Sequence, residues 1–533
     1  MMISKFLRLG LFSLTFCGVL LHPAQSNDAE VYLRKDGISM TKDEAKESAK
    51  EALGYLLNSA LAPQNDDGHQ RSLFQGEANE CNSLIGTLTV EEIRSMVIVL
   101  MQEQTPLGEF AIFALDSVIL RNLKYDVQLW KICGRCAEFE DDIKYPKNAG
   151  CGRQDYGFNA THSGLLVVPY DAGRGELIST TLPVNIVPAS ESVVPSETGY
   201  PVTSHPALLG AVISSITRVY TLEPDFTGRG ESKDYYRAFL IKQTYVTATL
   251  PLIWQAEAMV AEQSNCAAAM ADAYSLVGYS QGGFQVVALA DGLARMGKTI
   301  IAVYGGGAPY KLSTETLTYF VSRIKNGRLP IVFFVTLLAA ALSSTTTDAA
   351  NFGAGQDFLA EHVRDPLVHQ AQLAGANRDP LFAYIPEWDP LSVYNQKFIA
   401  LMEGGIARGE SNPCVTSVTN ETDKLCEALQ ENDLIHILES ANYPMFLCHS
   451  SEDESIPYSN LPSISSNPDY LHIKTVTGTH WEASTPCIID AVFFAANPFN
   501  LKWYRPADRT LEGGCEAGVS TGCNVWRRLF FRC

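Results

Sequence analysis

The chain has 533 residues, of which 46% are hydrophobic and 19% are charged, a composition typical of globular proteins rather than disordered, collagenous or coiled-coil chains. Its 40 Lys and Arg residues against 59 Asp and Glu residues give a formal net charge of −19. Because counterion-release binding needs clustered Lys and Arg, we do not expect nucleic acid or an anionic membrane as the main partner.

The first 26 residues have the organisation of a cleavable secretory signal. Lys5 and Arg8 give a positive start, and a mostly apolar run follows from Leu9 to Leu21. Ala24-Gln25-Ser26 then supplies the small residues that a signal peptidase requires. The apolar run is too short to span a membrane. We therefore predict that the mature chain begins at Asn27 and is secreted or resides in the endomembrane lumen.

Residues 27–150 are predicted to form a partly helical N-terminal extension. A polar stretch from Thr41 to Leu61 has helical character, and a break rich in Gln, Asn, Asp and Gly follows near 64–79. Two apolar helix-like segments then lead to about Leu120.

After residue 150, short apolar runs alternate with helical segments, the pattern of a mostly parallel sheet flanked by helices. We predict that this α/β core has two parts, 151–310 and 441–500. The predicted strands are 164–169, 183–187, 217–222, 274–277, 299–304, 445–448 and 470–476. The predicted helices are 205–216, 235–262, 282–296 and one after Trp481.

The segment 311–440 separates two predicted strands and is too long for a loop, so we interpret it as an inserted helical cap. Its apolar run Leu329–Leu342 is too short for a membrane span and predicts a buried or lid helix. Sequons at Asn159 and Asn420 mark candidate glycosylation sites in surface loops. Residues 501–533 form a predicted Cys-rich tail held by disulfides.

Twelve cysteines follow the signal segment, an even number that fits structural disulfides in an oxidising compartment. The local pair that we expect is Cys414 with Cys426, which would close a short polar loop. Cys133 and Cys136 have the spacing of a redox motif or half of a zinc site, but a second such pair is missing from the sequence. Structural disulfides are therefore the preferred interpretation, and we predict neither a metal nor another cofactor.

The strongest chemical motif is Gly278-Tyr279-Ser280-Gln281-Gly282, a G-x-S-x-G pattern between a predicted strand and a predicted helix. In that context Ser280 is expected in a sharp turn that presents its hydroxyl as a nucleophile, and small residues are needed on both sides. The backbone N–H of Gln281 is expected at the start of the following helix, where it can stabilise a developing oxyanion.

A serine nucleophile needs a base and an orienting carboxylate, which in this arrangement follow in the order Ser, Asp or Glu, His. Glu452, Asp453 and Glu454 follow the predicted strand 445–448. We choose Asp453 because its position four residues before Pro457 matches the usual D-x-x-V/I-P acid loop.

Two histidines lie beyond the acid, His472 and His480. His472 is inside a predicted strand, where a structural role is the default interpretation. His480 follows Gly478 on the loop after that strand, so we predict that His480 is the base.

At these residues the chain resembles the α/β-hydrolase superfamily, and more narrowly the secretory lipases and related secreted esterases of fungi and bacteria. The resemblance covers roughly residues 160–490 and implies an α/β-hydrolase fold with a cap. It is carried by the opening hairpin at 163–169 and 182–184, EPDFTGRGES at 223–232, the elbow GYSQGG at 278–283 and GGGAPYKL at 305–312.

One feature differs from many relatives, which carry a His-Gly dipeptide after the strand that corresponds to 183–187. Here the aligned residues are Pro188, Ala189, Ser190 and Glu191. The resemblance implies that a backbone N–H near Ser190 is the second oxyanion donor. Residues 27–150 and the tail have no counterpart that we recognise.

Taken together, the sequence predicts a secreted serine hydrolase that cleaves carboxylic esters through Ser280, Asp453 and His480. The apolar run in the cap favours hydrophobic esters or lipids and a transient contact with a lipid interface. Two alternatives stay open, a serine peptidase or carbohydrate esterase on the same fold and a non-catalytic exported binding protein. The sequence does not predict the oligomeric state.

Overall fold

The computed structural model comprises two units, Met1–Gly54 and Tyr55–Cys533. It describes residues 31–33, 39–41, 81–104, 120–136, 160–180, 183–188, 196, 205–225, 227–233, 238–264, 270–324, 338, 359–362, 390–407, 414 and 423–495. In the first unit, β1 (Val31–Leu33) and β2 (Ser39–Thr41) form an antiparallel pair. The predicted signal segment, both sequons and the Cys-rich tail fall outside the described residues, as does the helix expected over 41–61 apart from Thr41, which is the last residue of β2.

The second unit is built on a mixed ten-stranded sheet in the order β12-β11-β10-β9-β7-β8-β5-β4-β3, with β6 paired to β5. Neighbours from β12 to β8 run parallel, whereas β8–β5, β5–β4, β4–β3 and β5–β6 are antiparallel. The strands are β3 (Ser83–Leu88), β4 (Asp126–Gly134), β5 (His162–Asp171), β6 (Glu176–Leu177), β7 (Val184–Ile186), β8 (Thr221–Pro224), β9 (Ala273–Tyr279), β10 (Thr299–Gly306), β11 (Met445–Ser450) and β12 (Leu471–Val476).

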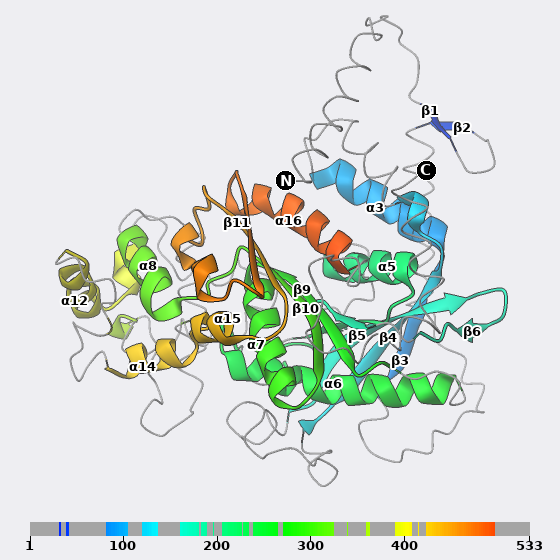
Figure 1. Cartoon of the computed structure of the whole chain (residues 1–533), viewed down its shortest axis with the longest axis horizontal. Coiled ribbons are helices and arrows are strands. Elements are labelled where there is room, and N and C mark those ends of the chain that lie inside the picture. The colour runs from blue at the N-terminus through cyan, green and yellow to red at the C-terminus, as the bar shows by residue number, and fades with distance from the viewer. Residues whose placement is uncertain are drawn as a thin grey trace, which may run out of the picture. The chain divides into compact units, whose positions relative to one another are not determined.

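Helices cover both faces of this sheet, which makes it a three-layer α/β arrangement (Figure 1). α6 (Lys242–Gln263) and α7 (Gln281–Arg295) pack on one face. α3 (Val90–Gln104), α5 (His205–Thr217) and α16 (His480–Ala495) pack on the other. The predicted α/β fold class is confirmed.

The central strands have apolar residues at successive positions because both of their faces are buried. In β5, Leu166 and Val168 face the cluster under α6 and α7, whereas Leu165 and Val167 face the cluster under α3, α5 and α16. All four side chains are fully buried. A strand covered on both faces loses the apolar–polar alternation of a half-exposed strand and needs apolar residues at successive positions.

The sheet begins before residue 151, where the sequence pattern placed the start of the core. β3 and β4 extend it through antiparallel pairing of β4 with β5, and α3 covers them. In β4 the alternation of buried Val127 and Leu129 with partly exposed Gln128 breaks at Trp130 and Lys131, which are both partly exposed, so the period-2 pattern that signals a strand is short.

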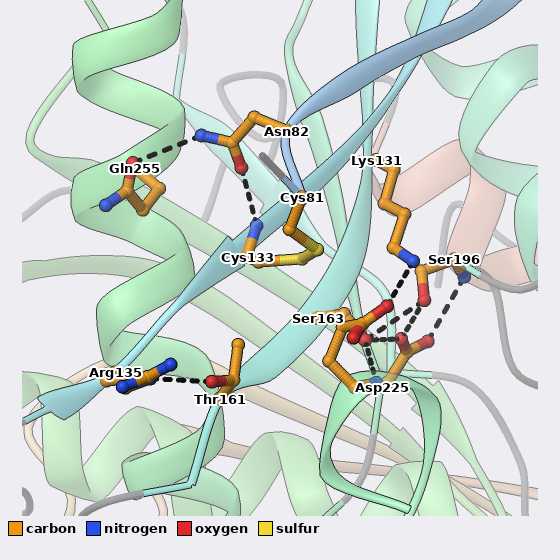
Figure 2. Close-up of a disulfide and its surroundings, with 11 residues drawn as sticks. Cys81, Asn82, Lys131, Cys133, Arg135, Thr161, Ser163, Ser196, Asp225 and Gln255 are labelled. Carbon is orange, nitrogen blue, oxygen red and sulfur yellow. Dashed lines mark hydrogen bonds and ion pairs between the residues drawn. A yellow bond between two sulfur atoms is a disulfide. The ribbon is translucent and has the colours of Figure 1, made fainter. Parts of the chain in front are cut away.

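A disulfide joins the outer strands of this region, as Figure 2 shows. Cys81, just before β3, is bonded to Cys133 near the end of β4. Asn82 accepts a hydrogen bond from the Cys133 backbone N–H at 2.8 Å and donates to Gln255 of α6 at 3.4 Å. Cys136 is also disulfide-bonded. The two cysteines of the C-x-x-C motif therefore form structural disulfides, as predicted.

Between β10 and β11 the chain is helical apart from an isolated bridge between Leu359 and Tyr394, as far as the structure describes this segment. A short π-helical segment, η7 (Leu312–Thr316), leads into α8 (Leu317–Ile324). The remaining elements are η9 (Pro390–Val393), α12 (Gln396–Ala407), α14 (Asp423–Glu431) and α15 (Ile435–Ser440). The expected disulfide Cys414–Cys426 is confirmed here. Apart from Leu338, the apolar run Leu329–Leu342 lies outside the described residues.

Two predicted boundaries move for local reasons. The strand predicted at 217–222 starts only at Thr221, because Thr217 still belongs to α5 and Arg218 adopts a positive φ of 67°. The helix predicted from 235 begins at Lys242, because Leu240 adopts a positive φ of 57° and Ile241 is extended. None of the helices in the described part of the chain has both the length and the apolar character needed to cross a membrane.

Candidate active site

Ser280 lies in the turn between Tyr279, the last residue of β9, and Gln281, the first residue of α7. Its φ of 58° and ψ of −123° form a conformation that residues with a side chain rarely adopt. The Ser280 N–H donates to the Gly306 carbonyl oxygen at 2.7 Å, which holds the turn against β10. The strained turn is therefore stabilised by the neighbouring strand, and it places the hydroxyl at the carboxyl edge of the parallel strands.

The glycines of the turn are required to different degrees. A Cβ added at Gly278 would lie 2.2 Å from the Gly282 carbonyl oxygen, and one at Gly283 would lie 2.6 Å from that of Gly306. A Cβ at Gly282 would meet the Pro188 carbonyl oxygen at 3.3 Å, a tight contact rather than an overlap. The turn therefore excludes a side chain most strongly at 278 and 283.

The acid loop follows β11 and orders the carboxylate of Asp453. One oxygen, Oδ1, accepts backbone N–H groups from Ser455 at 2.9 Å and Ile456 at 2.7 Å. The other oxygen, Oδ2, lies 2.7 Å from Nδ1 of His480. Asp453 is 7% exposed, so these contacts replace most of its hydration.

His480, the first residue of α16, connects the acid to the serine. Its Nε2 lies 2.9 Å from Oγ of Ser280, and its ring is buried. Because an ionised carboxylate only accepts hydrogen bonds, the proton of the neutral imidazole belongs on Nδ1, facing Asp453. Nε2 is then the acceptor of the Ser280 hydroxyl proton. The structure thus brings together three side chains that are up to 200 positions apart in sequence.

The carboxylates on either side of Asp453 contact the backbone of the histidine loop instead of the ring. Glu452 accepts the Gly478 N–H at 3.1 Å, and Glu454 accepts the His480 N–H at 2.9 Å. All three consecutive acidic residues therefore contact this loop, but among them only Asp453 is hydrogen-bonded to the imidazole. Sequence reasoning had no signal for the roles of Glu452 and Glu454, because both contacts depend on loop geometry.

Further contacts fix the position of the histidine. The Tyr279 hydroxyl donates to the His480 carbonyl oxygen at 2.6 Å, and burial raises the pKa of that phenol, so it remains a neutral donor. The disulfide Cys448–Cys487 joins β11 to α16, the two elements next to the acid and the base. The cysteine spacing alone did not identify this pair.

The turn after β8 carries the PDFTGRG passage, and its polar residues form a buried network (Figure 2). Asp225 accepts a hydrogen bond from the Ser163 hydroxyl at 2.6 Å and from the Ser196 N–H at 3.2 Å. Oγ of Ser163 in turn accepts the Glu231 N–H at 2.9 Å. A Cβ at Gly230, whose φ is 53°, would lie 2.1 Å from that oxygen. These contacts tie the turn to β5 and identify a structural use for the motif.

The structure describes one of the two predicted oxyanion donors, Gln281. Gln281 is the first residue of α7, so its N–H lies at a helix N-terminus, where no carbonyl of the same helix can accept it. Ser190 falls outside the described residues. Pro188, two positions earlier, approaches the elbow at Gly282, which places the end of this strand segment beside the turn.

By distance, the structure offers one candidate metal group among the described residues, Cys81, Cys133 and Glu231. The two sulfur atoms are joined in a disulfide and are not thiolates. This donor set therefore does not fit a metal ion.

No protein-family model matches the sequence, and the comparison with curated proteins gives no match. Solved structures are similar. One is a Legionella pneumophila protein described as a hydrolase, with a TM-score of 0.55, 18% identity and coverage of 80% of this chain and 99% of that one. Another is the rice cell wall degrading esterase LipA from Xanthomonas oryzae, in a ligand-bound form, with a TM-score of 0.51, 16% identity and coverage of 78% and 96%. At this identity the likeness shows the fold, and the chain has the α/β-hydrolase fold.

Proposed function

We propose that this protein is a secreted serine hydrolase that cleaves carboxylic esters through an acyl-enzyme. The observation that carries the proposal is the continuous chain of hydrogen-bonding contacts from Asp453 through His480 to Ser280. It is supported by the strained backbone of Ser280, since such strain persists where the surroundings impose it. The fold shared with a hydrolase and an esterase agrees with this chemistry.

In the proposed mechanism, Nε2 of His480 takes the proton of Ser280 as Oγ attacks the ester carbonyl. The imidazolium that forms is stabilised by Asp453, which stays ionised and keeps the ring in the required tautomer. His480 then protonates the leaving alcohol. Water attacks the acyl-enzyme by the same sequence of proton transfers and regenerates Ser280.

The tetrahedral intermediate carries a negative charge that needs donors already in place. We assign one donor to the backbone N–H of Gln281, where the N-terminal dipole of α7 also favours negative charge. We assign the second to the backbone near Ser190. This assignment is supported by the position of the Pro188 carbonyl oxygen, which would lie 3.3 Å from a Cβ at Gly282 of the elbow. Pro188 precedes Ser190 by two residues.

A hydrophobic ester is the proposed substrate. Trp481 is 58% exposed, and its ring centroid lies 5.7 Å from that of His480, so apolar surface borders the base. A second candidate is an ester carried by a cell wall polymer, which the description of the Xanthomonas oryzae esterase favours.

The test is to compare wild type with Ser280→Ala. A fluorophosphonate probe should label wild type at Ser280 and leave the variant unlabelled, and the variant should lose several orders of magnitude in kcat on p-nitrophenyl esters. Activity on long acyl chains supports the hydrophobic substrate, and activity confined to acetyl esters rejects it. Equal rates for both proteins would remove Ser280 as the nucleophile.

A further inference from the structure

A second histidine contacts the acid of the proposed triad. His449 lies on β11, between β10 and β12, and its side chain is completely buried. Its Nε2 lies 3.5 Å from Oδ2 of Asp453, the same oxygen that faces Nδ1 of His480 at 2.7 Å. The same carboxylate oxygen therefore lies near two imidazole rings, and of these two His480 is the one hydrogen-bonded to it.

The hydrogen bonds of His449 determine where its proton lies. Nε2 is 3.0 Å from the Ile456 carbonyl oxygen, which only accepts, so Nε2 carries the hydrogen and donates it. Nδ1 is buried and has no hydrogen-bond partner among the described residues. Adding a proton to Nδ1 would bury a charge without an acceptor. Burial accordingly lowers the pKa of His449, and the ring is neutral.

Ile456 of the acid loop is hydrogen-bonded both to His449 and to the carboxylate of Asp453. The Ile456 N–H donates to Oδ1 of Asp453, and the Ile456 carbonyl oxygen accepts the N–H of His449. The ring of Tyr458 packs edge-on against His449, with centroids 6.0 Å apart. The orientation of the carboxylate therefore depends on a loop that His449 anchors to β11.

We propose that His449 is a positioning residue, which holds Asp453 so that Oδ2 faces His480 while remaining uncharged itself. The inference rests on the proposed function. Because the His449 N–H donates to the Ile456 carbonyl oxygen and the ring carries no full charge, His449 orders the loop without placing a cation beside Asp453, which leaves the carboxylate to stabilise the imidazolium of His480. The alternative is a histidine that only fills the core.

The experiment compares His449→Phe with His449→Gln in the full-length protein. Phe keeps a ring and removes the donor, whereas the Gln amide can still donate to the Ile456 carbonyl. We expect His449→Phe to lower kcat per labelled site by about 10²-fold with KM unchanged, because small displacements of catalytic groups have effects of that size. His449→Gln should recover most of the loss.

The matched control is His472→Phe. His472 lies on β12, and its ring stacks on that of Phe446 with centroids 4.9 Å apart, so the kcat of this variant should equal that of wild type.

A double-mutant cycle separates positioning from packing. If His449 acts through Asp453, adding His449→Phe to Asp453→Asn should change the fluorophosphonate labelling rate by less than about twofold. Equal effects in both backgrounds, or an unchanged kcat in the single variant, would overturn the proposal. Should the Phe variant not fold, His449→Gln and His449→Met, similar in length but different in donor, give the same comparison. Wild type that neither reacts with the probe nor hydrolyses esters would instead contradict the proposed function.

Discussion

At the scale of single residues, the neighbours of Asp453 show how similar side chains acquire different roles. Glu452, Asp453 and Glu454 are consecutive, yet Glu452 and Glu454 bind backbone N–H groups and Asp453 alone among them is hydrogen-bonded to the imidazole. The difference arises because the loop directs each carboxylate to another part of the histidine segment.

This difference leads to a prediction for the acid. Asp453→Asn should lower kcat by about 10⁴-fold, since an amide can donate to Nδ1 and favour the wrong tautomer of His480. Glu452→Gln is the control, because its partner is the backbone of Gly478 and its loss leaves the contact between acid and ring intact. Initial rates on a p-nitrophenyl ester measure both. If the two variants lose activity equally, Asp453 is not the orienting acid.

Glu223 allows a prediction about stability and pH. This residue of β8 is fully buried, and burial, followed by the charge of Asp225, raises its pKa well above the usual value near 4.5. The folded chain therefore keeps a proton that the unfolded chain releases, so the free energy of unfolding falls as pH rises above about 4.5 toward the folded-state pKa.

Glu223→Gln removes this dependence, because the amide does not ionise. Relative to wild type, the variant should become more stable as pH rises from 4.5 to 8, and the difference should be smallest at the acid end. Urea unfolding at several pH values measures it. Glu176→Gln, on the exposed surface of β6, is the control and should show no such trend. A stability difference that does not grow with pH would contradict the buried neutral acid.

At the scale of elements, β11 and α16 carry the acid loop and the base, and the Cys448–Cys487 disulfide joins them. Replacing both cysteines by Ala should cost about 2–4 kcal/mol in the free energy of unfolding. It should also lower kcat, because the relative position of acid and base depends on these two elements. Thermal unfolding and kcat per labelled site provide the two measurements.

The disulfide Cys414–Cys426 is the matched control, since it closes a loop in the segment between β10 and β11. Its removal should lower stability but leave kcat per labelled site unchanged. If both pairs affect kcat alike, Cys448–Cys487 has no particular role in aligning the site.

At the scale of the whole molecule, the sheet brings together groups from distant parts of the chain. The elbow follows β9, the acid loop follows β11 and the histidine follows β12, and these strands run parallel and end at one edge. Ligands in open α/β sheets bind beyond this carboxyl edge, so the topology alone favours a site at this place.

The proposed secretion of the molecule has a direct test. Expressed in a secreting host, the protein should appear in the medium with Asn27 as its first residue, which N-terminal sequencing would reveal. The disulfides of the described residues fit an oxidising compartment. Retention of residues 1–26 on the exported protein would contradict the cleavage site.

The sequence by itself determined the α/β class and the elbow, because both are local. Apolar runs indicate strands that are buried on both faces, and the glycines of a G-x-S-x-G motif predict a sharp turn at the serine. It missed β3 and β4, since the alternation in β4 is short, and the place of β4 beside β5 is decided by pairing and not by local sequence.

Tertiary structure decided which side chains meet. The Cys448–Cys487 pair and the contacts of Glu452 and Glu454 with backbone N–H groups of the histidine loop join segments that are far apart along the chain. Residue spacing restricts only near neighbours along the chain, whereas these contacts are set by strand order and by the loops at the edge of the sheet.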